Sequence, residues 1–229
     1  AIYRETYPSC QPDLLDKISR IVGNPVLDCV HELRARRSEL RVAWGIQGDQ
    51  PAVLFMPQHL LYCEDASRAR LIAHTLYKRH WSDLATVAFG PTYRTMLGQL
   101  QDWCRKENAT IIVKSRSKHH DPAALREIAD LHLVDTTEWY PPLSVAAMIA
   151  ADLVVSVWST SVFESAYLGC YNITLSVPTF YDQKFPSYHI FTPTLFEWPG
   201  VTKLVRHDGL RRFLAGHKPS DFRVDQVAQ

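Results

Sequence analysis

Residues 151–164 read ADLVVSVWSTSVFE, and this stretch decides the fold. Leu153-Val154-Val155 is a continuous apolar run, as expected for a strand that is buried on both faces of a parallel sheet. A hydroxyl-rich turn follows, and a helix is then predicted from Ser159 to Leu168, where Gly169 ends it. A strand, a turn and a helix in this order are typical of α/β proteins.

The same alternation extends along the chain in both directions. Further strands are predicted at residues 52–56, 85–89, 111–113, 131–134 and 173–175. Further helices are predicted at residues 26–44, 66–79, 93–104, 122–129, 141–150 and 208–214, whereas 178–199 is predicted to be irregular. The fold class is therefore α/β, with a Rossmann-like parallel sheet of five or six strands and helices on both faces. Residues 1–48 are interpreted as an N-terminal arm and linker helix, and 49–229 as the Rossmann-like domain.

Composition and charge exclude several classes of function. The 229-residue chain has a formal net charge of +1, which argues against nucleic acid as a partner. Its five cysteines are too scattered for a disulfide framework or a zinc site, which favours a cytoplasmic location. Asp152 interrupts the longest apolar stretch, residues 143–157, so no transmembrane segment is predicted. Peripheral contact with the inner face of the membrane, through a further domain, stays open.

The turn after the 153–155 strand is the first candidate site, because ligands of parallel sheets bind beyond the carboxyl ends of the strands. Backbone amides and hydroxyls at a helix start suit phosphate oxygens, and an acidic side chain one turn later suits ribose hydroxyls. The candidate donor-binding residues here are Trp158, Ser159, Thr160, Ser161 and Glu164. A capping box between Ser161 and Glu164, which needs no ligand, is the structural alternative.

A second candidate is the basic loop at residues 114–121. Lys114, Arg116 and Lys118 could neutralise a diphosphate, and His119 could act as an acid or base near neutral pH. A solvated basic loop is the alternative interpretation. Neighbouring histidines also suggest a metal, but the spacing provides no third ligand, so no metal site is predicted. His59, after the 52–56 strand, is a weaker catalytic candidate.

Two further loops offer weaker candidates. Trp139, in the loop after the 131–134 strand, could stack on a base, although packing in the core explains it equally well. Asp182 and Gln183 follow the 173–175 strand and suit sugar hydroxyls. The chain lacks GxxxxGK[ST], GxGxxG, GxSxG and DxD patterns, which argues against P-loop, nicotinamide-dependent, α/β-hydrolase and DxD-type metal-dependent chemistry.

Taken together, these segments resemble the C-terminal, donor-nucleotide-binding domain of GT-B-fold glycosyltransferases. The similarity is carried by residues 22–25, the arginine-rich helix, 40–46, 51–57 and 151–169. Lipid A disaccharide synthase, MurG-type transferases, UDP-GlcNAc 2-epimerases and CDP-glycerol glycerophosphotransferases share variants of this pattern. The resemblance implies one half of a GT-B fold and metal-independent transfer from a nucleotide-activated sugar or CDP-glycerol donor, without a cofactor.

The resemblance also implies roles for individual residues. The hydroxyls of residues 159–161 would contact the diphosphate of the donor, and Glu164 would contact its ribose. Lys114 and Arg116 match a loop that often reads KxHP or KxR in the superfamily, and residues 182–183 would contact the donor sugar. Arg116 and Glu164 are expected to face each other across one cleft, on the interpretation that both follow neighbouring strand ends.

A GT-B enzyme needs an N-terminal domain that supplies the acceptor site. We therefore expect a missing acceptor domain or partner subunit, and an incomplete catalyst when this chain stands alone. The acceptor is expected to be a glycan or a lipid-linked molecule of cell-envelope polysaccharide synthesis. A UDP-sugar 2-epimerase-like enzyme and a non-catalytic nucleotide- or carbohydrate-binding module remain alternatives.

Overall fold

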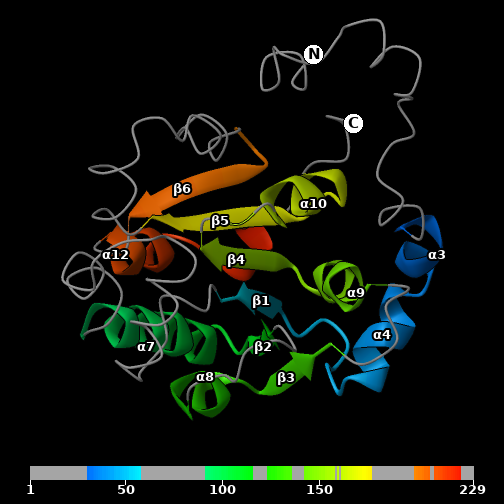
Figure 1. Ribbon diagram of the computed structural model, residues 1–229, viewed down its shortest axis with the longest axis horizontal. Helices are drawn as coiled ribbons and strands as arrows, with labels where there is room; N and C mark the ends of the chain where they lie inside the picture. Colours follow the sequence, from blue (N-terminus) through cyan, green and yellow to red (C-terminus); the bar gives the residue numbers. More distant parts are fainter. Residues whose placement is uncertain are drawn as a thin grey trace, which may run out of the picture.

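The computed structural model describes residues 30–57, 91–115, 123–135, 142–157, 159, 161–176, 199–206 and 209–222. Within these residues six strands form one sheet in the order β3-β2-β1-β4-β5-β6, and each pairs with its neighbours in parallel (Figure 1). The strands are β1 (Ala52–Met56), β2 (Thr110–Ser115), β3 (Leu131–Val134), β4 (Leu153–Val157), β5 (Tyr171–Ser176) and β6 (Thr202–Arg206). The predicted α/β class with a parallel, Rossmann-like sheet is confirmed.

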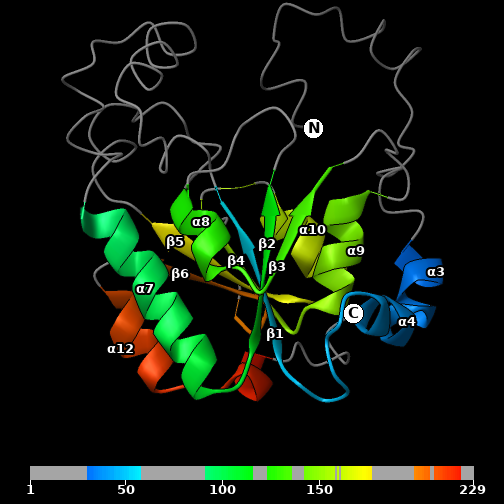
Figure 2. The same cartoon turned by 90° about the horizontal axis from the view of Figure 1, so that it is seen from below.

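Helices cover both faces of this sheet. Figure 2 shows α7, α8 and α12 on one side and α3, α4, α9 and α10 on the other. The helices are α3 (Val30–Ala35), α4 (Arg37–Ala43), α7 (Pro91–Lys106), α8 (Ala123–Ile128), α9 (Leu143–Ala150), α10 (Ser161–Tyr167), α12 (Leu210–Ala215) and the 3-10 turn η6 (Pro219–Phe222). Helix α9 begins directly after Pro142, where the fixed φ of proline suits a helix start.

The core has two layers because successive side chains of a strand point to opposite faces of the sheet. In β1, Val53 and Phe55 pack in the layer beneath α7, α8 and α12. Ala52 and Leu54 pack in the layer beneath α3 and α9. All four side chains are fully buried, which explains the continuous apolar run of this strand.

The structure differs from the sequence-based prediction in three elements. The helix expected over 26–44 is divided into α3 and α4 at Arg36 within its described part. Strand β6 was not predicted, because its two buried side chains, Thr202 and Val205, alternate with exposed or half-buried ones. The expected strand at 85–89 and helix at 66–79 lie outside the described residues.

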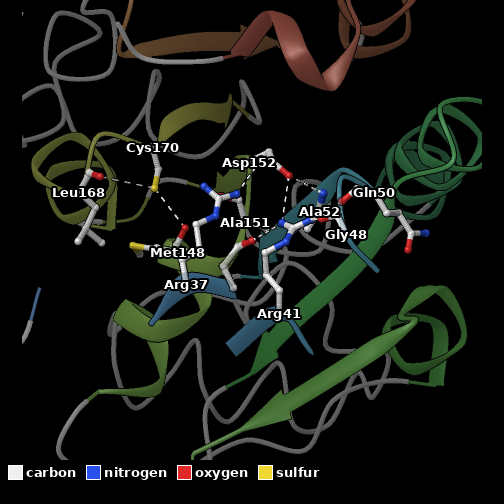
Figure 3. A network of polar contacts seen from close by, with 11 residues as sticks. Arg37, Arg41, Gly48, Gln50, Ala52, Met148, Ala151, Asp152, Leu168 and Cys170 are labelled. Atoms are coloured by element: carbon white, nitrogen blue, oxygen red, sulfur yellow. Dashed lines mark hydrogen bonds and ion pairs between the residues drawn. The ribbon is translucent and has the colours of Figure 1, made fainter. Parts of the chain in front are cut away.

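A polar network at the amino edge of the sheet fixes α4 to the strands (Figure 3). The carboxylate of Asp152 accepts hydrogen bonds from Arg37 at 2.7 Å, from Arg41 at 3.3 Å and from the backbone amide of Ala52 at 2.9 Å. Arg41 also donates to the carbonyl of Ala150, at 2.7 Å. These acceptors hold the guanidinium of Arg41 inside the protein, with 8% of the residue exposed.

Candidate functional site

The strand order reverses between β1 and β4. From β1 the chain builds outward through β2 to β3, and from β4 it builds in the other direction through β5 to β6. In open parallel sheets the crevice at such a reversal, beyond the carboxyl ends of the strands, is where ligands bind. Here Met56 of β1 pairs with Ser156 of β4, so the carboxyl ends of these two strands lie side by side. The predicted donor turn therefore lies at the reversal point.

Two hydroxyls of this turn lie within the described residues. The Ser159 Oγ accepts a hydrogen bond from the backbone amide of Ser161 at 3.2 Å, which closes the turn and starts α10. Ser161 is 4% exposed, and its Oγ has no hydrogen-bond partner among the described residues. In a capping box the Oγ of Ser161 would accept from the backbone amide of Glu164, so the structural alternative is not observed.

The interior next to this turn is polar. Asn172 of β5 is fully buried, and its Oδ1 accepts hydrogen bonds from Ser156 at 3.2 Å and from Thr174 at 2.9 Å. Its Nδ2 has no partner among the described residues. One turn into α10, the hydroxyl of Ser165 donates to the carbonyl of Val162 at 2.9 Å. Ser165 is thus satisfied within its own helix, in contrast to Ser161.

At the carboxyl end of β2, Lys114 is held by an acidic partner. Its Nζ lies 2.6 Å from the Oδ2 of Asp135, which directly follows β3, and the side chain of Lys114 is 8% exposed. On the other side of the same strand end, the Oγ of Ser115 lies 3.0 Å from the Nε2 of His132. The charge of Lys114 is therefore balanced before any ligand arrives, and its predicted role toward a diphosphate stays a prediction.

The expectation that β2 and β4 are neighbours is wrong. Strand β1 lies between them, so their ends are roughly 10 Å apart, which is two interstrand steps. A ligand that reached both the loop after β2 and the turn after β4 would have to cross β1. The remaining predicted site residues lie outside the described residues; they are His59, Arg116, Lys118, His119, Trp139, Trp158, Thr160, Asp182 and Gln183. Glu164 is partly exposed on α10.

The described residues contain neither a cluster that could hold a metal ion nor a helix that could span a membrane. No group of three or more His, Cys, Asp or Glu side chains within it is arranged to hold a metal ion. Among the same residues, no helix has both the length and the apolar character that crossing a bilayer requires.

Comparison with known proteins gave matches among solved structures only. No protein-family model and no curated protein matches the chain. A glycosyl transferase family 9 protein from Veillonella parvula is 12% identical, with a TM-score of 0.41, and the match covers 83% of this chain and 49% of that protein. The C-terminal CMP-Kdo binding domain of WaaA from Acinetobacter baumannii is 8% identical, with a TM-score of 0.39, covering 81% of this chain and 89% of that domain.

A third structure, the beta Kdo 2,4 transferase KpsC from Thermosulfurimonas dismutans, is 17% identical, with a TM-score of 0.33, covering 70% of this chain and 47% of that protein. The chain thus spans about half the length of the first and third proteins. With such low identities and TM-scores these likenesses assign no family.

Proposed function

We propose that this chain is the donor-binding half of a transferase that moves a sugar or glycerophosphoryl group from a nucleotide-activated donor to a glycan or lipid-linked acceptor. The nucleotide binds at the carboxyl edge of the sheet, between the ends of β1 and β4. The observation that carries this proposal is the coincidence of the strand-order reversal with a hydroxyl-rich turn that contains a buried, unpartnered hydroxyl.

The position of the turn favours a nucleotide over other small molecules. Sheets with this strand order bind nucleotides at the reversal point, because the two adjacent loops separate there and leave a crevice. The turn offers small hydroxyl side chains and no acidic residue before Glu164, so phosphate oxygens meet no repulsion from the turn itself. On this proposal Glu164, one helical turn later, accepts from the ribose hydroxyls of the donor.

The hydroxyl of Ser161 supports the proposal energetically. A buried hydroxyl without a partner costs about 1–3 kcal/mol, so a native protein retains it where a partner arrives later. A phosphate oxygen would accept from it, and a hydrogen bond to a charged group contributes about 1.5–3 kcal/mol. Among the described residues the Ser161 hydroxyl makes no hydrogen bond that would stabilise the fold. When the donor binds, it can donate a hydrogen bond to a phosphate oxygen.

The proposal is tested by isothermal titration of the chain with UDP, CDP and CMP, in the wild type and in the Ser161→Ala variant. We expect a pyrimidine nucleoside diphosphate to bind and Ser161→Ala to weaken it by about 10- to 100-fold, the equivalent of one charge-assisted hydrogen bond. CMP, which lacks the second phosphate, should bind more weakly than CDP.

Ser165→Ala is the matched control, because it removes an equally buried serine hydroxyl from the same helix. That hydroxyl is already bonded to Val162, so its loss should lower stability by up to about 1 kcal/mol and leave nucleotide affinity unchanged. Ser161→Ala should leave stability unchanged or raise it. The absence of nucleotide binding by the wild type, or equal losses of affinity in the two variants, would contradict the proposal.

A further inference from the structure

A cavity lies at the amino edge of the sheet, at the other end of the strands from the proposed donor site. Its volume is about 810 Å³, and it is enclosed by α3 and α4, the 48–49 turn, the start of β4, the segment after α10 and Phe222. Small-molecule sites typically have volumes of about 300–1,000 Å³. The cavity is separated from the proposed donor site by the length of the strands, since the two lie at opposite ends of β4.

The lining carries three arginines, Arg34, Arg37 and Arg41, against two aspartates, Asp49 and Asp152. Arg41 is a structural group, because its guanidinium donates to the carbonyls of Ala150, Gly48 and Gln50 as well as to Asp152. Both carboxylate oxygens of Asp152 are likewise occupied, as Figure 3 shows. Neither group is therefore available to a ligand.

Arg34 and Arg37 retain donors. The side-chain hydrogen bonds of Arg37, to Asp152 and to the carbonyl of Ala151, all use one nitrogen, Nη2, and its side chain is 41% exposed. Arg34 is exposed and donates from its Nη2 to the carbonyl of Tyr167 at 3.2 Å. Each guanidinium has five N–H donors, so among the described residues both arginines, which line the cavity, keep donors on Nε and Nη1. The excess of positive charge and of donors indicates an anionic ligand.

We propose that this cavity binds a small molecule that carries a phosphate group, through Arg34 and Arg37. The two guanidinium groups, one from the end of α3 and one from the start of α4, present two forks of donors, which the three terminal oxygens of a phosphate can accept together. The lining also includes the apolar side chains of Ile149, Leu168 and Phe222, which suit the body of a phosphate ester. This site is independent of the proposed donor site.

The test is calorimetric titration of the chain with inorganic phosphate and with phenyl phosphate, at ionic strength matched with sodium chloride. The variants are Arg34→Gln and Arg37→Gln, with Arg36→Gln as the control. Arg36 lies between them in sequence, but its Nε pairs with Glu39 at 2.9 Å and it does not line the cavity.

We expect binding by the wild type, at least tenfold weaker binding by Arg34→Gln and Arg37→Gln, and unchanged binding by Arg36→Gln. Arg34→Gln is the more direct variant, because it leaves the Asp152 network intact. Tighter binding of phenyl phosphate would identify a phosphate ester as the occupant, and equal binding would identify the free ion; both support the site. No binding by the wild type, or a loss in Arg34→Gln no larger than in Arg36→Gln, would overturn it.

Discussion

Replacing Asp152 with alanine should lower the free energy of unfolding by about 3 kcal/mol. The substitution removes the acceptor of three hydrogen bonds, from Arg37, Arg41 and the amide of Ala52. Removing one partner of a buried ion pair costs about 3–5 kcal/mol, because the other charge is left uncompensated. The value belongs at the lower end of this range, because the Asp152 side chain is 23% exposed and Arg41 keeps its carbonyl acceptors.

The assay is urea-induced unfolding, followed by tryptophan fluorescence and circular dichroism to check that the transitions coincide. Glu39→Ala is the control, since it breaks the Arg36–Glu39 pair on the surface of α4, where the two side chains are 53% and 68% exposed. Exposed helical pairs of this kind contribute about 0.2–0.5 kcal/mol. A loss in Asp152→Ala below about 1 kcal/mol, or equal to that in the control, would refute a stabilising role for the network.

The remaining predictions concern buried groups. Burial raises the pKa of Cys104 to about 12, and the nearby charge of Asp130 adds a smaller increase. Burial also raises the pKa of Cys170 to about 11, although the positive charges of Arg37 and Arg34 lower it in part. Both thiols should therefore resist alkylation by iodoacetamide at pH 8 in the folded chain, and mass spectrometry that finds them modified as fast as in urea would contradict this. The pKa values of both thiols in the folded chain lie above the ordinary value of 9.0, so the protonated thiols contribute fully to the free energy of unfolding below pH 9. This contribution should fall as the pH rises toward 11–12, and urea midpoints measured across this range would show the fall. Asp135→Asn should lower the free energy of unfolding by about 2–3 kcal/mol, because it leaves Lys114, whose side chain is 8% exposed, without its acidic partner. The Lys114→Met/Asp135→Asn double variant should recover part of that loss in the same urea assay. Equal stability of the single and double variants would refute this role of the pair.

Most of the strands that could be predicted from the sequence are buried on both faces. The runs at 52–56, 111–113, 153–155 and 173–175 correspond to such strands, because largely apolar runs of this length are typical of the interior strands of an α/β fold. The predicted strand at 131–134 is the edge strand β3, which is only partly buried. Strand β6 lies at the edge of the sheet and includes Lys203 and Arg206, so its pattern does not differ enough from that of a loop.

The polar interior was harder to predict. Asp152 was interpreted only as a break in an apolar stretch, yet it anchors α4 to the sheet through residues more than a hundred positions away. The repeated arginines at 34, 37 and 41 can be seen in the sequence, but their roles depend on which strand begins next to the helix. This proximity is a feature of the tertiary structure, and the local sequence pattern does not reveal it.

The position of the turn after β4 could be predicted from the sequence, but its hydrogen bonds could not. The turn after β4 was expected at a carboxyl end, and it lies there because the strand is parallel to all its neighbours. The pairing of Lys114 with Asp135 was missed, although both residues were expected at carboxyl ends, because the adjacency of β2 and β3 is a property of the sheet order. For the same reason the separation of β2 from β4 could not be predicted.

The most direct test of the central claim is amide NMR of the isotopically labelled chain during titration with UDP and CDP. If the nucleotide binds at the strand-order reversal, chemical-shift changes should concentrate on Met56, Ser159, Ser161 and Glu164. The titration uses the Arg34→Gln variant, so that the arginine-lined cavity at the amino edge does not compete for the phosphates. In this variant the amides of Arg37 and Asp152 serve as internal references and should not move. Changes concentrated at the amino edge, or no changes with either nucleotide, would contradict the account.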